Sequence, residues 1–512
     1  MKTTQQSNRE PAKEQPASKP GTKPRRRWLQ FTLRGLIVLM IFAAIGAFWL
    51  RSEVLRAREQ RLAVERIFEL GGRVRYAHEL QPDGQLVAKP VPPGPKWLQE
   101  LLGENLFLTV KGVYLQDVEA TDADMDVLAP LNDVETLFFA NATRDPQRVN
   151  LGDETMKHLA DMYDLRSLYI FRMGVTDEGA KALRHLTKLY SVGLDDTLIT
   201  DAGLANLRNC TSMRYMSLNG LTGVTDAGLE HLQDMTGMER LSMRDTNIVG
   251  PGLRHLRRMK KLTSLDLWNA PLSDEGLEHL WELTSLYELR LRCPNLTDAG
   301  LARLGEIPSV GRLELIGTQV TDAGLKHLSG LTNLDFLLLE GPNLKGAGLA
   351  DLAALPKLTL LHLGYSNLDQ AGWEALAELR QIPNVWLRFA TFSHDNIRTL
   401  VESMPQLNML TFQGTQLDDD DVAVLMQLPN LERLLLKDTK ITDQALTTLS
   451  RSTTLKHIDL VGTAVTDAGL LELAKIPSLE EVHVADTQIT TQGIQSFWKL
   501  KPLCDVFDKR QR

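Results

Sequence analysis

The chain has 512 residues, enough for about three or four ordinary domains or for one long repetitive array. Apolar residues make up 43% of it, which excludes a wholly disordered protein. The net charge of −8 is uneven: residues 1–30 hold eight Lys or Arg against two acids, so residues 31–512 hold 49 against 63, or −14. An acidic body argues against nucleic acid as a partner, because a nucleic-acid-binding surface is basic. Cys210, Cys293 and Cys504 are too few for a disulfide framework or a four-thiolate zinc site.

The N-terminus predicts a basic tail followed by a membrane-spanning helix. Residues 1–27 are rich in Lys, Pro, Gln, Ser and Thr, so we expect a disordered tail on the cytoplasmic side. Residues 28–50 are predominantly apolar and long enough to cross a hydrocarbon layer of about 30 Å as a helix. Trp28 and Trp49 lie at its two edges, where indole rings favour the interface. Basic residues concentrate before the span, which places residues 51–512 outside the cytoplasm.

The same apolar run has a second interpretation, a secretory signal that is cleaved. Gly35–Ile45 would be its apolar core, and the small residues around Ala43–Ala47 would offer a cleavage site. The run continues through Phe48, Trp49 and Leu50, however, and this continuation favours an uncleaved anchor.

Residues 51–120 are expected to form a stalk helix and an N-terminal cap. A charged amphipathic helix is predicted from Val54 to Leu70, ended by Gly71-Gly72, with a short strand at 73–76. A second short helix is expected at Trp97–Leu102, after a loop rich in Pro and Gly. A terminal unit of altered sequence shields the open end of a repeat array.

Residues 121–508 are dominated by an internal repeat. The phrase Val-Thr-Asp-Ala-Gly-Leu at Val320–Leu325 recurs at Val224–Leu229 and Val465–Leu470. With its Thr position opening each unit, twelve of the fifteen intervals between starts are 24 residues, two are 25 and the first is 31. The units start at residues 121, 152, 176, 200, 225, 249, 273, 297, 321, 345, 369, 393, 418, 442, 466 and 490.

Within a unit the apolar residues change from a helical to a strand spacing. Thr321 can cap a helix, and Asp322 is an acid in its first turn. Leucines spaced by three follow, and leucines spaced by two then enter a short strand. One unit cannot cover its own leucines, so stacked units must share a core and a parallel sheet with strands about 4.8 Å apart. The predicted fold class is α/β, a solenoid with a curved parallel sheet on its concave face and helices on its convex face, preceded by a transmembrane helix.

The repeat resembles a known family. Leu455, Ile458, Leu460, Thr463 and Val465 follow the pattern Leu-x-x-Leu-x-Leu-x-x-Thr-x-Val, which resembles the leucine-rich repeat. The Thr-Asp-Ala-Gly-Leu that follows is similar to the helical subtype with Cys in place of Asn. The layout also resembles bacterial proteins in which an N-terminal anchor precedes such repeats. This resemblance implies a single-pass protein of the bacterial inner membrane, with about 16 repeats that bind a partner protein.

Threonine commonly stands at the Asn or Cys position of the repeat. This departure from the family pattern suggests a ladder in which the hydroxyls bond the backbones of neighbouring units. The threonines are Thr197, Thr246, Thr318, Thr439, Thr463 and Thr487.

Two clusters could suggest metal sites, and each has a simpler interpretation. Five histidines share one place in their units, but helices of neighbouring units lie about 8–10 Å apart, too far for their nitrogens to share one zinc ion. The run Asp418–Asp421 would suit calcium, yet it falls where every unit starts its helix. We expect no metal, no cofactor and, because no catalytic motif is recognisable, no enzymatic activity. The histidines are His158, His231, His255, His279 and His327.

The informative positions lie between the strand leucines and face the concave side. Large apolar groups there should meet water and need an explanation, and Trp, Tyr and Arg are enriched at interface hot spots. We predict that they bind a partner protein, with a carbohydrate or cell-envelope polymer as the alternative ligand. A further possibility is that neighbouring side chains cover one another without any ligand. This concave patch comprises Trp268, Phe336, Leu338, His362, Tyr365, Trp386 and Arg388.

Overall fold

The computed structural model describes residues 33–81, 85–116, 120–141, 151–365 and 367–508. The expected tail, Trp28 and the start of the expected span lie outside the described residues. The chain divides into two compact units, residues 1–57 and 58–512, which are described separately.

The described residues of the first unit form one helix, the N-terminal part of α1 (Leu33–Glu69). This helix continues without a break past residue 50, so the expected span and the expected stalk helix are one element. In the first unit its large apolar side chains are exposed, with Phe48 at 76% and Trp49 at 62%. By length and composition alone, α1 contains a stretch that could cross a membrane.

In the second unit, the end of α1 leads directly into a cap for the sheet. Gly71 has a left-handed backbone (φ 82°), and Gly72 N donates to Ile67 O at 2.8 Å, which satisfies a carbonyl at the helix C-terminus. β1 (Arg73–Tyr76) has the bounds expected for the short strand and pairs antiparallel with β2 (Val110–Gln116). This pairing covers the edge at which the parallel sheet begins.

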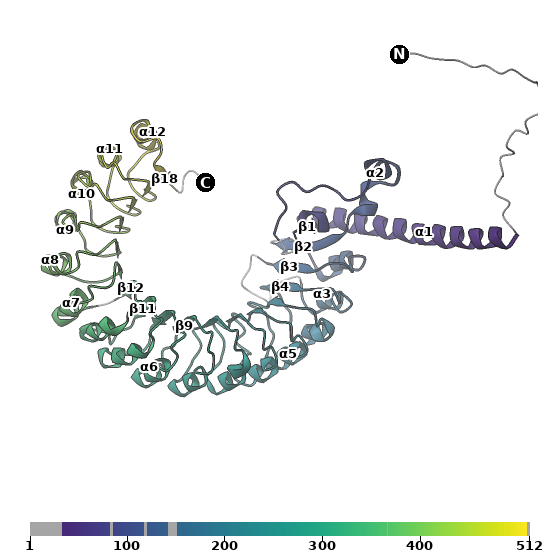
Figure 1. Cartoon of the computed structure of the whole chain (residues 1–512), viewed down its shortest axis with the longest axis horizontal. Helices are drawn as coiled ribbons and strands as arrows, with labels where there is room; N and C mark the ends of the chain where they lie inside the picture. The colour runs from purple at the N-terminus through teal and green to yellow at the C-terminus, as the bar shows by residue number, and fades with distance from the viewer. Residues whose placement is uncertain (1–32, 82–84, 117–119, 142–150, 366, 509–512) are drawn as a thin grey trace, which may run out of the picture. The chain divides into compact units, whose positions relative to one another are not determined.

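Eighteen strands form one sheet within the described part of the chain. From β2 onward each strand pairs in parallel with the next along the chain, for example Leu313 beside Leu337 and Leu337 beside Leu361. Within the second unit the strands line the inner side of an arc and the helices its outer side (Figure 1). The remaining strands are β3 (Thr136–Ala140), β4 (Ser167–Phe171), β5 (Ser191–Gly193), β6 (Tyr215–Ser217), β7 (Arg240–Ser242), β8 (Ser264–Trp268), β9 (Glu288–Arg292), β10 (Arg312–Ile316), β11 (Phe336–Glu340), β12 (Leu360–Gly364), β13 (Asn384–Arg388), β14 (Met409–Gln413), β15 (Arg433–Leu435), β16 (His457–Asp459), β17 (Glu481–His483) and β18 (Asp505–Phe507).

The helical segments of the outer side differ in winding. The sequence predicts one short helix per unit, and many units instead have a 3₁₀ helix (η). A helix of one or two turns is marginal alone, so the packing of its leucines decides the winding more than its intrinsic propensity does. The α-helices are α2 (Lys96–Leu102), α3 (Asp153–Lys157), α4 (Asp177–Ala180), α5 (Asp201–Leu204), α6 (Asp298–Leu304), α7 (Gln370–Ala377), α8 (His394–Ser403), α9 (Asp419–Leu425), α10 (Asp443–Leu449), α11 (Asp467–Leu473) and α12 (Thr491–Leu500). The 3₁₀ helices are η1 (Ala77–Glu79), η2 (Glu104–Phe107), η3 (Asp122–Leu128), η5 (Lys181–His185), η6 (Ala205–Leu207), η7 (Gly228–Leu232), η8 (Pro251–Arg258), η9 (Asp274–His279), η10 (Asp322–Gly330) and η11 (Ala347–Ala354).

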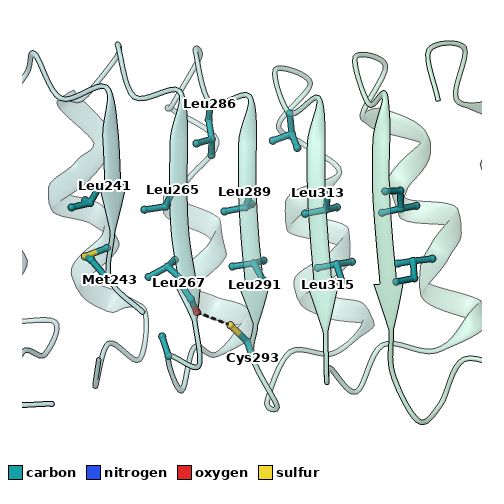
Figure 2. Packing of buried hydrophobic residues seen from close by; sticks show 14 of the residues in the cluster. Leu241, Met243, Leu265, Leu267, Leu286, Leu289, Leu291, Cys293, Leu313 and Leu315 are labelled. Carbon is teal, nitrogen blue, oxygen red and sulfur yellow. Dashed lines mark hydrogen bonds between the residues drawn. The ribbon is translucent and has the colours of Figure 1, made fainter. Parts of the chain in front are cut away.

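The repeat leucines form one continuous core between the sheet and the helices. Figure 2 shows successive strands with their leucines on the same side, where Leu265, Leu289 and Leu313 lie in register. Their exposed fraction is 0% in each case. Cys293 lies in this core and its thiol contacts Leu267 O of the preceding unit at 3.7 Å.

The threonine ladder expected at the Asn or Cys position is wrong. Thr197 Oγ1 donates to Leu194 O at 2.8 Å, within its own unit, and Thr463 bonds Leu460 O in the same way at 2.6 Å. A hydroxyl three residues after a strand carbonyl reaches that carbonyl more easily than the next unit, so it closes a local turn.

A different ladder, made by aspartate, links the units. Asp298 accepts bonds from the Thr321 N–H at 2.8 Å and from the Thr321 hydroxyl at 2.6 Å, although Thr321 lies 23 residues later. A Cβ on Gly324 would lie 2.2 Å from Asp298 Oδ1, so this glycine makes room for the carboxylate. The Thr-Asp-Ala-Gly-Leu phrase therefore encodes a bond between units. At Thr321 the hydroxyl makes no helix-cap bond, contrary to the sequence expectation.

Candidate binding surface

The concave patch is only partly open to solvent. Phe336 and Leu338 on β11 are 7% and 9% exposed, and with Ile316 they form a small apolar cluster separate from the main core. Trp268 and Leu360 pack against this cluster. For Phe336 and Leu338 the structure shows the arrangement in which neighbouring side chains cover one another.

Arginines complete the cover over this apolar cluster. The guanidinium carbon of Arg312 lies 4.3 Å from the Phe336 ring centre, and those of Arg244 and Arg292 lie 5.7 Å from the Trp268 ring. A guanidinium over an aromatic face is attracted by the ring quadrupole and shields the apolar surface below it. The Trp268 side chain is therefore half-buried beside the guanidinium groups of Arg244 and Arg292.

Trp386 on β13 lies at the centre of the part of the concave patch that is more exposed to solvent. It lies in register between His362 on β12 and Thr411 on β14. The rings of His362 and Trp386 have centres 5.3 Å apart, and Trp386 Nε1 lies 2.9 Å from Met409 Sδ. The backbone thus places one indole between two polar side chains on a continuous face of three strands.

Polar atoms around Trp386 are buried without hydrogen-bond partners. Within the described residues these atoms include His362 Nδ1, Arg388 Nε and Thr411 Oγ1. A buried polar atom left unpaired costs about 1–3 kcal/mol, so this cluster destabilises the free protein. Burial lowers the pKa of His362 to about 4, with a further contribution from the charge of Arg388, so its imidazole is neutral at pH 7.

Arg388 also borders two aromatic rings, Tyr365 just after β12 and Phe389 just after β13. Its guanidinium carbon lies 6.0 Å from the Tyr365 ring centre and 5.3 Å from that of Phe389. These two rings stack on each other, with centres 4.6 Å apart and an interplanar angle of 22°. The concave patch predicted from sequence includes Tyr365 and Arg388 but not Phe389.

The backbone at these two aromatic residues is unusual. Tyr365 has φ 46° and Phe389 has φ 50°, in the left-handed region that bulky residues avoid at a cost of about 1 kcal/mol or more. In other units the equivalent left-handed residue is Gly, Asp or Asn, except for Arg172. Phe389 could have been found from the sequence, because it is an aromatic residue at a turn position where most units have a residue suited to positive φ. The equivalents are Asp196, Gly220, Asp245, Asn269, Gly317, Gly414, Asp438, Gly462 and Asp486.

A second aromatic group lies on the same face of the first strands. Phe138 contacts Tyr114, Tyr169 and Phe171, with ring centres 6.3, 5.9 and 5.5 Å away. Sequence reasoning missed this group, although aromatic residues recur at one strand position in successive units. A Cβ on Gly193 would lie 2.6 Å from the Phe171 ring, so the glycine leaves space for that ring.

Between the two aromatic regions the face is hollow and polar. An open hollow of about 600 Å³ is lined by small side chains such as Ser217 and Ser242. A charge network borders it: Asp266 pairs with Arg244 at 2.6 Å, and Arg290 pairs with Glu288 at 2.7 Å. Each of these four charges already has a partner of opposite sign.

Three residues on the helical side could hold a metal by the proximity of their ligand atoms: His394, Asp418 and Asp421. Hydrogen bonds within the protein account for this group. His394 Nδ1 lies 2.7 Å from Asp421 Oδ1, Asp418 caps α9, and the Asp418 N–H donates to Asp421. The hydrogen bond to Asp421 raises the pKa of His394 above its ordinary value. None of the five histidines of the repeat row is in this group.

The three cysteines are buried free thiols. Burial raises the pKa of Cys293 to about 12 and those of Cys210 and Cys504 to about 11. A nucleophilic cysteine needs a lowered pKa, so these thiols act as small core residues.

Comparisons with known proteins agree with the repeat geometry. A family model described as Leucine Rich repeat matches residues 451–474. No curated protein matches the sequence. An internalin from Listeria monocytogenes is 21% identical over 64% of this chain and 88% of its own, with a TM-score of 0.44. A leucine-rich repeat protein from Leptospira interrogans is 16% identical over 76% of this chain and 98% of its own, with a TM-score of 0.43.

The family match covers a segment with the same geometry as the units around it. Residues 451–474 contain β16 and α11, with the Asp443–Thr466 bond linking two units. The parallel sheet, the shared leucine core and this match identify the fold as a leucine-rich repeat solenoid.

Proposed function

We propose that the protein is a membrane-anchored scaffold that binds another protein through the sheet face around Trp386, without catalysis of its own. Solenoids present extended concave surfaces of this kind to their partners. α1 would supply the anchor, with residues 28–50 in a bacterial inner membrane and the repeats outside the cytoplasm. Rigid presentation on strands means that little side-chain order has to be gained on binding.

The observation that carries this proposal is the set of unpaired polar atoms beside Trp386. His362 Nδ1, Arg388 Nε and Thr411 Oγ1 are buried without partners among the described residues. Tryptophan and arginine are the side chains that most often dominate protein interfaces. Docking of a partner over Trp386 would bury the indole, and these atoms would gain partners once their side chains turned toward it.

The test is crosslinking in intact cells with a membrane-impermeant reagent, followed by mass spectrometry. Trp386→Ala combined with Arg388→Ala should reduce the wild-type crosslinked partners at least tenfold while leaving the circular dichroism melt nearly unchanged. Trp281→Ala removes a 60% exposed tryptophan outside the sheet and is the matched control. Equal crosslinking by the double variant and the wild type would refute the proposed surface, and a complete lack of reaction with the repeats would refute their external location.

A further inference from the structure

The stacked rings of Tyr365 and Phe389 form a platform at the ends of β12 and β13. A Cβ on Gly414 would lie 2.3 Å from the Phe389 ring, so this ring rests on the bare backbone of the next unit. Tyr365 stacks on Phe389. The preceding unit has Gly341 at the equivalent position and no side chain to cover Tyr365, which is 54% exposed. The platform therefore ends in an open aromatic face.

Two unlike polar groups flank this open face. The Glu340 carboxylate lies over Gly364, where a Cβ would be 2.7 Å from Glu340 Oε2. Arg388 lies on the other strand and contacts both rings. Within the described part of the chain neither charged group forms a close ion pair, although Arg388 acts electrostatically on Glu340, and Arg388 Nε is buried without a hydrogen bond. An acceptor and a cationic donor thus border one flat apolar surface.

We propose that this rim, formed by Glu340, Tyr365, Arg388 and Phe389, binds an acidic glycan. The C–H groups of a pyranose ring pack on Tyr365, its carboxylate pairs with Arg388, and its hydroxyls donate to Glu340. The site is independent of the indole of Trp386, although Tyr365 and Arg388 belong to the concave patch as well.

The polar partners favour a sugar over an aromatic side chain of a protein. An aromatic side chain would stack on Tyr365 equally well but would bring no donor to Glu340. A pyranose carries donors and acceptors around its edge and can satisfy both flanking groups at once. Burial raises the pKa of Glu340, and the charges of Arg388 and Arg292 oppose this rise, so two cations lie near one carboxylate. The local charge therefore favours a carboxylate-bearing sugar.

The strained backbone supports a role for the rings in binding. At the same turn position Asn269, Asp438 and their equivalents adopt positive φ at lower cost. Two consecutive units use aromatic residues there instead, and their rings are aligned into one stack. Strain at exposed side chains of this kind is typical of ligand-binding positions.

The experiment measures binding of the full chain, in mild detergent, to immobilised polygalacturonate, dextran and poly-L-glutamate. We expect binding to polygalacturonate that is at least tenfold tighter than to dextran. Tyr365→Asn, which keeps a residue suited to positive φ, and Arg388→Gln should each weaken it at least tenfold. Tyr163→Ala removes a tyrosine with the same 54% exposure and should leave it unchanged.

Three outcomes would overturn the assignment. These are no binding to polygalacturonate, equal binding by Tyr365→Asn and the wild type, or equally tight and Tyr365-dependent binding to poly-L-glutamate, which would indicate an acidic protein. Trp386→Ala separates this proposal from the protein-binding one. That variant should retain polygalacturonate binding even when partner crosslinking is lost.

Discussion

His362 shows how a single side chain on the concave face responds to its surroundings. Its ring contacts Trp386, its Nδ1 atom is buried without a partner, and its pKa falls to about 4 because of burial and the nearby Arg388. The unfolded chain takes up a proton on this imidazole near pH 6.5. The stability that the neutral ring provides is therefore complete above pH 6.5 and is lost as the pH falls from 6.5 to 4.

We predict that His362→Leu removes this part of the acid sensitivity. Between pH 7 and pH 4 the variant should lose about 1–3 kcal/mol less unfolding free energy than the wild type, because it has no imidazole to protonate on unfolding. Urea unfolding at pH 7, 5.5 and 4 measures the difference, and the other titrating groups are common to both proteins. Parallel losses in the two proteins would contradict the lowered pKa.

At the residue scale the sequence predicted which strand positions form the concave patch, but not which of their side chains are covered by neighbours. The strand spacing placed Trp386, His362 and Arg388 correctly on β12 and β13 of one face. It could not show that Phe336 and Leu338 are covered, because their cover comes from Arg312 and Trp268 in other units. Phe389 was missed because the backbone angle that makes it unusual is not visible in a spacing pattern.

Between elements, the aspartate ladder is the main polar link. In eight pairs of units the carboxylate accepts the N–H of a later threonine at 2.6–2.9 Å and its hydroxyl at 2.6–2.7 Å. Each carboxylate at a helix start also favours the positive end of the helix dipole. One side chain thus stabilises its own helix and the helix of its neighbour.

Removal of one such aspartate should cost more than an ordinary surface substitution. We predict that Asp298→Ala lowers the unfolding free energy by about 2–3 kcal/mol, because the part-buried Thr321 N–H loses its charged acceptor. Asp351→Ala changes an exposed aspartate on η11 and should have an effect of less than about 0.5 kcal/mol. Urea denaturation of the two variants measures the contrast. Equal effects would show that the ladder contributes little.

At the element scale the period of the repeat predicted the fold because the leucines have only one place to be buried. The strand at 73–76 has the predicted bounds, and the second short helix begins one residue before the predicted start. The winding of each helix and the partner of each aspartate depend on the neighbouring unit. A pattern within one unit contains no information about that partner. The sequence therefore predicts only that each unit begins with a helix cap and an acid in the first turn.

Across the whole repeat array the ladder is not continuous. Its aspartate is replaced by Gly250 in one unit and by Gly346, Gln370 and His394 in three consecutive units. In the second gap Asn396 Nδ2 donates to Gln370 Oε1 at 3.3 Å, while His394 Nδ1 pairs with Asp421 Oδ1 of the next unit at 2.7 Å. The three units of this gap contain β12, β13 and β14, and the first two of these strands carry Trp386 and the aromatic platform.

We predict that this gap is the least stable part of the array. In a solenoid each interface contributes separately, so local opening occurs first where the links between units are fewest. Hydrogen exchange should be faster at the backbone amides of β12 and β13 than at those of β16 and β17, where the Asp443–Thr466 pair is intact. Gln370→Asp combined with Asn396→Gly restores the aspartate of one unit and the glycine of the next, and should slow that exchange. Uniform exchange across these strands would contradict the prediction.

The missing aspartate links also predict where the array deforms first under a mechanical load. When opposite ends of a solenoid are pulled, strain concentrates at the joints with the lowest stiffness, here those around Gly346 and Gln370. The curvature of the ligand-facing sheet would then change at the platform before it changed elsewhere. Tension along the array would in this way alter the spacing between Tyr365 and its flanking charges, and a bound ligand that spans the joints would act as a brace.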